Sequence, residues 1–238
     1  MTIQIGHFVE TILPQKYNVD MKNEIILYHG SNKVIKVPTV GGGKKHNDYG
    51  PGFYCTLDIE LAKEWASYTE DGGVVNSYDF NLTGLNVLSL YEDKYNVLNW
   101  MAILLKNRII HFTTPVEKRG FIFILNNFGI DTDSFDVIRG YRADDSYFSF
   151  SRAFLGNQIT IEQLENTLRL GNLGEQYFIQ SPKAFSELKF KSALPVTDGE
   201  YYCRRKIRDD GARAAFNRIL EENDTTGRYL SDIMRDGL

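Results

Sequence analysis

Two short polar stretches, each next to an apolar run, carry the residues best suited to chemistry. The first is His29-Gly30-Ser31, which follows the apolar residues 25–28. The second begins at Asp48 and continues as Gly50-Pro51-Gly52-Phe53-Tyr54-Cys55-Thr56. A polar sequence directly after a strand exposes a ring and backbone groups, and glycine permits positive φ or close approach of a ligand. The two stretches therefore predict a pocket built between two strand ends.

Two further clusters carry carboxylates or an amide. Glu175-Gln176 opens an apolar run, and alternation along a strand means that only one of the two side chains can face inward. Asp144-Asp145 follows a run that ends at Gly140. These two aspartates could bind a metal, orient an acceptor or pair with a neighbouring arginine. Equally, Asp145 could simply cap a helix.

Three blocks of the chain, in this order, resemble the ADP-ribosyltransferase superfamily. They are Tyr28-His29-Gly30-Ser31, the Asp48–Thr56 block and Ala143-Asp144-Asp145, and the resemblance covers roughly residues 24–192. The pattern is similar to the branch with a His-Tyr-(Glu/Gln) triad. Within that branch, the chain most resembles an uncharacterised bacterial group, associated with toxin–antitoxin cassettes, that has Tyr-His-Gly-Ser, Asp-x-Gly-x-Gly-Phe-Tyr-x-Thr and a later Ala-Asp-Asp.

The resemblance implies that NAD⁺ is a substrate and that its bond between nicotinamide and ribose is cleaved. That reaction develops positive charge on the ribose, as glycosidic cleavage does. It implies a catalytic triad of His29, Tyr54 and Gln176. The implied NAD-binding residues are His29, Gly30, Ser31, Gly52, Tyr54 and Thr56. The implied residues of the rim or the acceptor site are Asp48, Asp144, Asp145 and Glu175.

Each of the residues at the centre of the implied site has an expected task. His29 would hydrogen-bond the adenosine ribose, and the backbone of Gly30 would pair with the nicotinamide carboxamide. Tyr54 would pack against the nicotinamide ring, a role that suits a rigid amphipathic side chain. Gln176 would accept a hydrogen bond from a ribose hydroxyl. Its amide offers less charge stabilisation than a glutamate, which argues against chain polymerisation and favours mono-ADP-ribosylation.

The expected function is therefore an NAD-dependent mono-ADP-ribosyltransferase that acts as a bacterial toxin or defence effector. Its acceptor would be a macromolecule, either protein or nucleic acid, and a cognate inhibitor or antitoxin protein could be a partner. Two alternatives stay open. One is an NAD glycohydrolase, which transfers to water, and the other is an inactive domain that binds a nucleotide or a partner.

The pattern of apolar residues predicts an α+β fold with a mainly helical C-terminal extension. The resemblance implies that the core is an ADP-ribosyltransferase-like split β-sheet with flanking helices. The expected parts are an N-terminal extension over 1–23, the core domain over 24–196 and the extension over 197–238. Strands are expected over 24–28, 53–56, 74–82, 86–90, 135–140, 174–181 and 188–193. Helices are expected over 58–71, 94–110, 117–128, 160–171, 184–188, 212–222 and 226–234, and a helix or a turn is expected over 147–156.

Local signals sharpen some of these elements. Asp58 is a plausible cap for the first helix, and Thr160 with Gln163 has the spacing of a capping box. Residues 31–52 have the composition of a loop, and so long a loop is either functional or a surface connection. The basic run 204–208 is expected to be a solvated face, with a phosphate contact as the weaker possibility.

Composition narrows the class of protein. The 238 residues carry a net charge of −4, which argues against a broad nucleic-acid-binding surface. Two cysteines make no disulfide framework and favour a reducing compartment. No apolar run is long enough to span a bilayer, so we expect a cytoplasmic protein with no membrane partner. No His/Cys spacing suits zinc, and no metal is expected.

Overall fold

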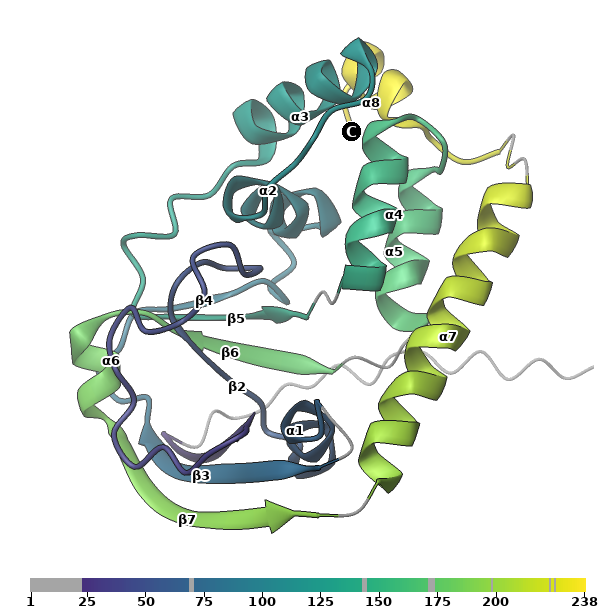
Figure 1. Ribbon diagram of the computed structural model, residues 1–238. Helices are drawn as coiled ribbons and strands as arrows, with labels where there is room; N and C mark the ends of the chain where they lie inside the picture. Colours follow the sequence, from purple (N-terminus) through teal and green to yellow (C-terminus); the bar gives the residue numbers. More distant parts are fainter. Residues whose placement is uncertain are drawn as a thin grey trace, which may run out of the picture.

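A computed structural model describes residues 23–68, 71–142, 145–170, 174–197, 199–222, 224 and 226–238; at 145–147 and 168–170 it describes the backbone alone. The described residues form an α+β fold with two β-sheets, as Figure 1 shows. The strands are β1 (Glu24–Ser31), β2 (Phe53–Cys55), β3 (Gly73–Asn81), β4 (Val87–Ser89), β5 (Val137–Tyr141), β6 (Glu175–Ile179) and β7 (Leu188–Val196). The helices are α1 (Ile59–Ala66), α2 (Val97–Asn107), α3 (Pro115–Phe128), α4 (Asp145–Leu155), α5 (Ile161–Leu170), α6 (Pro182–Ser186), α7 (Glu200–Glu221) and α8 (Leu230–Asp236).

The two sheets touch at one isolated bridge. The first sheet has the antiparallel order β1-β3-β7, and the second has the order β2-β6-β5-β4, in which only β4 and β5 are parallel. Tyr28 of β1 and Thr56, directly after β2, exchange backbone hydrogen bonds of 2.8 and 2.9 Å. The described strands thus form two sheets that are connected at the point where β1 passes β2.

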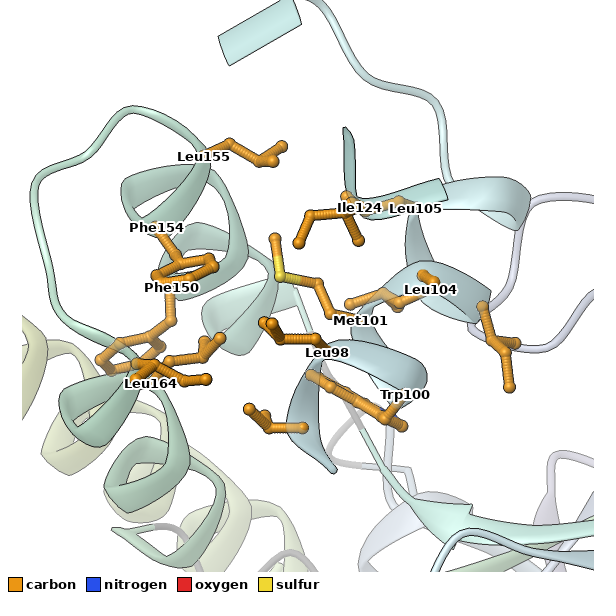
Figure 2. Packing of buried hydrophobic residues seen from close by; sticks show 14 of the residues in the cluster. Leu98, Trp100, Met101, Leu104, Leu105, Ile124, Phe150, Phe154, Leu155 and Leu164 are labelled. Atoms are coloured by element: carbon orange, nitrogen blue, oxygen red, sulfur yellow. The ribbon is translucent and has the colours of Figure 1, made fainter. Parts of the chain in front are cut away.

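Apolar side chains fill the space on both faces of the second sheet. Between the two sheets lies a cluster that includes Leu27 and Tyr78 from the first sheet and Phe53 and Tyr177 from the second. On the other face, the helices α2 to α5 cover the sheet with a larger cluster. Figure 2 shows Leu98 and Met101 of α2 pointing toward the aromatic side chains of α4. Successive residues of β6 therefore enter different cores, as strand alternation requires.

Helix ends follow the predicted caps. Asp58 accepts a hydrogen bond from the Glu60 N–H at 2.8 Å at the start of α1. Thr160 and Gln163 form the reciprocal pair of a capping box, with N···O distances of 2.9 and 3.2 Å. These hydrogen bonds confirm both sequence predictions. Helix caps depend only on neighbouring residues, which is why a local pattern can reveal them.

The helix predicted over 212–222 is longer than expected. It begins at Glu200, so the basic run 204–208 belongs to α7 rather than preceding a helix. Arg208 is largely withdrawn from water and pairs with Glu64 of α1, whereas Arg204 is 51% exposed and lies 3.5 Å from Glu60. The expectation of a solvated basic face is therefore wrong for Arg208.

The other boundaries differ from the prediction by a few residues. The helix expected over 226–234 is α8 and begins at Leu230, and the one expected over 94–110 is α2 and ends at Asn107. Leu230 and Ile233 of α8 lie in the cluster that covers the second sheet, together with Ala212 of α7. Among the helices of the described residues, none is long and apolar enough to cross a membrane.

Candidate functional site

Tyr54 is held in place by the turn that precedes β2. Its hydroxyl accepts a hydrogen bond from the Tyr49 N–H at 3.0 Å and donates one to the Gly50 carbonyl at 2.7 Å. Gly50 has φ +102°, which only glycine adopts without strain, and a Cβ on Gly52 would lie 2.3 Å from the Phe178 ring. The two glycines therefore have the two uses expected of them, positive φ and close approach.

The strand β6 turns Gln176 inward and Glu175 away. Gln176 is buried, and its Nε2 donates to the Tyr141 carbonyl at 3.1 Å and to Asp48 Oδ2 at 3.5 Å. Glu175, on the opposite face of the strand, accepts a hydrogen bond of 2.9 Å from Nη2 of Arg139. The Tyr141 carbonyl and the ionised Asp48 carboxylate can only accept hydrogen bonds, so the Gln176 amide nitrogen must be the atom that faces them. Oε1 is then the end that remains to accept.

Gln176 and Tyr54 line the same cavity. They come from neighbouring antiparallel strands and share the face of the second sheet that α2 covers, where Tyr54 contacts Phe178. The cavity has a volume of about 170 Å³. Its described lining consists of Asn47, Asp48, Tyr54, Trp65, Arg108, Arg142 and Gln176.

An ion pair forms one wall of the cavity. Arg108, at the C-terminal end of α2, donates to Asp48 Oδ1 from Nη2 at 2.7 Å and from Nε at 3.0 Å. The side chains are 17% and 7% exposed, so the charges are largely withdrawn from water. The neighbouring Asn107 donates to the Asp48 carbonyl at 3.4 Å. The loop over 31–52 is thereby attached to the end of α2.

The same loop is attached to the first sheet at its other end. Tyr78 of β3 donates to the Ile35 carbonyl at 2.6 Å, and Asn76 accepts from the Ile35 N–H at 2.8 Å. Asn76 also donates to the Lys33 carbonyl at 3.1 Å. These contacts hold the loop against the sheet, and Asn47 and Asp48, in its second half, line the cavity.

The His29 ring contacts β2 rather than the cavity itself. It is not among the described residues that line the cavity; its ring packs on Phe53 at 4.3 Å, and its Nδ1 lies 2.7 Å from the Tyr54 carbonyl. A carbonyl can only accept, so Nδ1 carries the proton and Nε2 of the neutral ring is an acceptor. The contact satisfies a carbonyl of β2 on the side that faces β1, beyond the Tyr28–Thr56 bridge. His29 therefore has a structural task in any case.

The backbone of Gly30 points in the same direction as that of Tyr28. Tyr28 uses its N–H and C=O on Thr56, and backbone groups along an antiparallel strand alternate with a period of two. Gly30, two residues on, therefore directs both groups away from its partner Val75 and toward the side of β2. Its other face is closed by α1, since a Cβ on Gly30 would lie 2.1 Å from the Ala62 carbonyl.

The remaining predicted residues lie at different distances from the cavity. Thr56 is buried at the bridge, where its hydroxyl accepts from the Asp58 N–H at 3.1 Å. Ser31 donates to the Lys33 carbonyl at 2.6 Å. Neither is among the described residues of the cavity lining. Asp144 and the side chain of Asp145 lie outside the described residues.

Burial shifts the pKa of several groups at the site. Desolvation lowers the pKa of His29, and the hydrogen bond to the Tyr54 carbonyl opposes this only in part. Desolvation raises the pKa of Tyr54, which therefore keeps its proton at neutral pH. The pKa of the fully buried Cys55 is raised for the same reason, so this thiol is a packing residue, as expected. Within the part of the chain that is described, no three metal-ligating side chains lie close enough together to hold an ion.

Sequence reasoning missed Trp65, Arg108, Arg142 and Asn47. The Arg142 guanidinium lies 5.0 Å from the centre of the Trp65 ring, and both residues belong to the lining of the cavity. Helical spacing puts Trp65 on the apolar face of α1, so the sequence pattern indicates a core residue rather than a site residue. Trp65 belongs to α1, which packs against β1 and β3 of the first sheet, whereas Arg108 lies at the end of α2 on the second sheet. No local pattern encodes the meeting of these elements.

Residues 25–190 match the family described as "Protein of unknown function (DUF3990)". Since the match covers well over half of the chain, the protein belongs to this family. No curated protein matches the chain significantly. No solved structure does so either.

Proposed function

We propose that this protein is an NAD-dependent mono-ADP-ribosyltransferase. The observation that carries the proposal is the meeting of Tyr54 and Gln176 in one cavity. The two residues lie far apart in the sequence, and the resemblance assigned both of them to the reacting end of NAD⁺. A chance resemblance at the level of short motifs gives no reason for the two side chains to share one face of the sheet and one cavity.

The size of the cavity suits one part of the substrate. Ligand pockets usually enclose roughly 300–1,000 Å³, and this cavity has about 170 Å³. It is large enough for a ring and too small for a dinucleotide. In the proposed complex the nicotinamide end enters the cavity against the Tyr54 ring, and the rest of the dinucleotide lies along β1.

The reaction exchanges one bond for another. The bond between the nicotinamide nitrogen and ribose C1′ breaks, and nicotinamide leaves. An acceptor atom then forms a bond to C1′ and loses its proton. Residues that hold hydrogen-bond acceptors toward the ribose lower the energy of the charge that develops there. Oε1 of Gln176 is suited to this task, because Nε2 is already committed to Tyr141 and Asp48.

The groups of β1 fit the remaining contacts that were expected. The N–H and C=O of Gly30 both point toward β2, and a carboxamide offers the matching acceptor and donor. The neutral His29 ring presents Nε2 as an acceptor for a ribose hydroxyl, while Nδ1 stays on the Tyr54 carbonyl. A role as a toxin or defence effector, an antitoxin partner and a cytoplasmic location are parts of the same proposal and rest on the resemblance.

Labelled NAD⁺ distinguishes the proposed transfer from its alternatives. The purified protein is incubated with NAD⁺ labelled in the adenylate half, in the presence of a bacterial lysate. Transfer predicts label retained on protein or on nucleic acid, and protease and nuclease treatments show which of the two carries it. Free ADP-ribose without retained label would instead indicate a glycohydrolase. Absence of nicotinamide release, with a Gln176→Glu variant equally inert, would indicate a binding domain and refute the proposal.

A further inference from the structure

The cavity contains one carboxylate in addition to the proposed triad. Gln176 occupies the triad position at which a glutamate would supply charge, and it is neutral. Among the described residues of the cavity lining, Asp48 alone is acidic. Its side chain is 7% exposed, and Asp48 Oδ2 lies 3.5 Å from Gln176 Nε2. A negative charge is therefore present directly beside the uncharged triad residue.

The surroundings of Asp48 keep this carboxylate ionised and fixed. Arg108 makes two hydrogen bonds to Oδ1, which favours the charged form of the carboxyl group. The contact with Gln176 has a direction, because an ionised carboxylate can only accept and must face the NH₂ end of the amide. The Tyr141 carbonyl imposes the same direction at 3.1 Å. The two acceptors together fix the amide so that Oε1 faces away from them.

We propose that Asp48 is a positioning residue for the transfer reaction. It orients the Gln176 amide. It also supplies the negative charge that a glutamate at position 176 would carry, from a position one side chain further from the ribose. This inference rests on the proposed function, since it assigns to Asp48 the electrostatic part of that reaction. The proposal predicts that Asp48 and Gln176 act together as a carboxylate–amide pair. A variant with the amide at position 48 and the carboxylate at position 176 should then keep part of the activity.

A purely structural task for the ion pair is the competing account. Asp48 would then only attach the loop over 31–52 to α2 through Arg108. In that case the loss of its charge would lower stability, and a new charge at position 176 could not compensate. A charge exchange between the two positions therefore separates the accounts.

The decisive experiment compares Asp48→Asn, Gln176→Glu and the double variant Asp48→Asn/Gln176→Glu with the wild type. Nicotinamide release from NAD⁺ gives kcat and KM for each. We expect Asp48→Asn to lower kcat by about 10²-fold, as the loss of one stabilising group at a developing charge does, and to leave KM within about threefold. In the double variant the new amide at position 48 donates to the new carboxylate at position 176, so the hydrogen bond is reversed. We expect this variant to recover at least about tenfold of the loss.

A measurement without NAD⁺ tests the contact itself. Gln176→Glu places a second carboxylate beside Asp48, with Arg108 and Arg142 as the cationic neighbours and Tyr49 and Tyr54 as the neutral ones. Repulsion from Asp48 raises the pKa of the new carboxyl, so the single variant becomes less stable as pH rises from 5 to 8. In the double variant the neutral amide at position 48 removes this repulsion, and the Tyr141 carbonyl alone still opposes the new charge. We expect its melting temperature to fall less between pH 5 and 8 than that of Gln176→Glu.

Each outcome decides one question. A wild type that releases no nicotinamide refutes the proposed function, and this inference with it. An active wild type with Asp48→Asn at full kcat, or with a double variant no faster than Asp48→Asn, refutes the inference alone. Should Asp48→Asn fail to fold because Arg108 loses the Asp48 carboxylate, Asp48→Asn/Arg108→Gln removes both charges. This variant must fold and still show the reduced kcat.

Discussion

The ring and the hydroxyl of Tyr54 have separate tasks. The ring lines the cavity, whereas the hydroxyl joins the Tyr49 N–H to the Gly50 carbonyl. Tyr54→Phe should therefore keep nicotinamide release within about tenfold of the wild type and lower the free energy of unfolding by about 1–2 kcal/mol. Urea unfolding with a parallel activity assay measures both effects.

Tyr78→Phe is the matched control for this variant. It removes another buried hydroxyl that holds the same loop, through the Ile35 carbonyl, but that lies away from the cavity. We expect a comparable loss of stability and full activity. A Tyr54→Phe variant as inactive as Tyr54→Ala would show that the hydroxyl, rather than the ring, carries the function.

The burial of His29 predicts a dependence of stability on pH. Its pKa in the folded state lies below the usual 6.5, so the unfolded chain binds the proton more readily. Stability conferred by the neutral ring is present above pH 6.5 and is lost as pH falls below it. Unfolding free energies at several pH values between 7.5 and 5 should show a smaller decrease for His29→Gln than for the wild type. The exposed His111→Gln serves as the control; equal slopes for His29→Gln and wild type would contradict the account.

At the residue scale, the sequence predicted what depends on one strand and missed what depends on contacts between elements. The two-residue period of β6 sufficed to separate Glu175 from Gln176, and the structure turns Gln176 inward. The pairing of Asp48 with Arg108 joins a loop to the end of a helix 60 residues away in the chain. Nothing in either neighbourhood specifies that encounter.

At the scale of elements, the contact of β1 with α1 is tight. A Cβ on Gly30 would lie 2.1 Å from the Ala62 carbonyl and 2.5 Å from the Ala66 nitrogen, both of which are backbone atoms. Gly30→Ala must displace α1, and we expect it to cost about 2 kcal/mol or more in unfolding free energy. Because α1 also carries Trp65 into the cavity, the substitution should lower activity as well.

Gly211 is a contrasting glycine within α7. A Cβ there would meet nothing within 4 Å, and the residue is exposed. Gly211→Ala should raise the free energy of unfolding by about 0.5–1 kcal/mol, because alanine loses less backbone freedom in a helix. Thermal unfolding of the two variants should therefore shift in opposite directions. Equal shifts would show that the Gly30 contact is looser than described.

The start of α7 could not be predicted from its sequence pattern. Most of its first half is polar and offers no apolar face, so the helix was expected only from Ala212. The structure holds that half against α1 through charged side chains, including the pair Arg208–Glu64. Helices fixed in this way depend on partners that are far away in the chain.

At the scale of the whole molecule, the two sheets define the site. Strand periods predicted that most of these segments would be strands, but not which strands would pair. The single bridge between Tyr28 and Thr56 sets β1 against β2, and β2 in turn lies beside β6. This arrangement places Gly30, Tyr54 and Gln176 in one region, although the three residues are widely separated in the sequence.

The central claim is that this region cleaves NAD⁺, and nicotinamide release by the purified protein tests it most directly. We predict nicotinamide release above the rate in buffer for the wild type and for Tyr78→Phe. We predict a loss of release in both His29→Ala and Tyr54→Ala. Circular dichroism must show that all variants are folded. A wild type that releases no nicotinamide would contradict the account. So would folded His29→Ala and Tyr54→Ala variants that keep the wild-type rate.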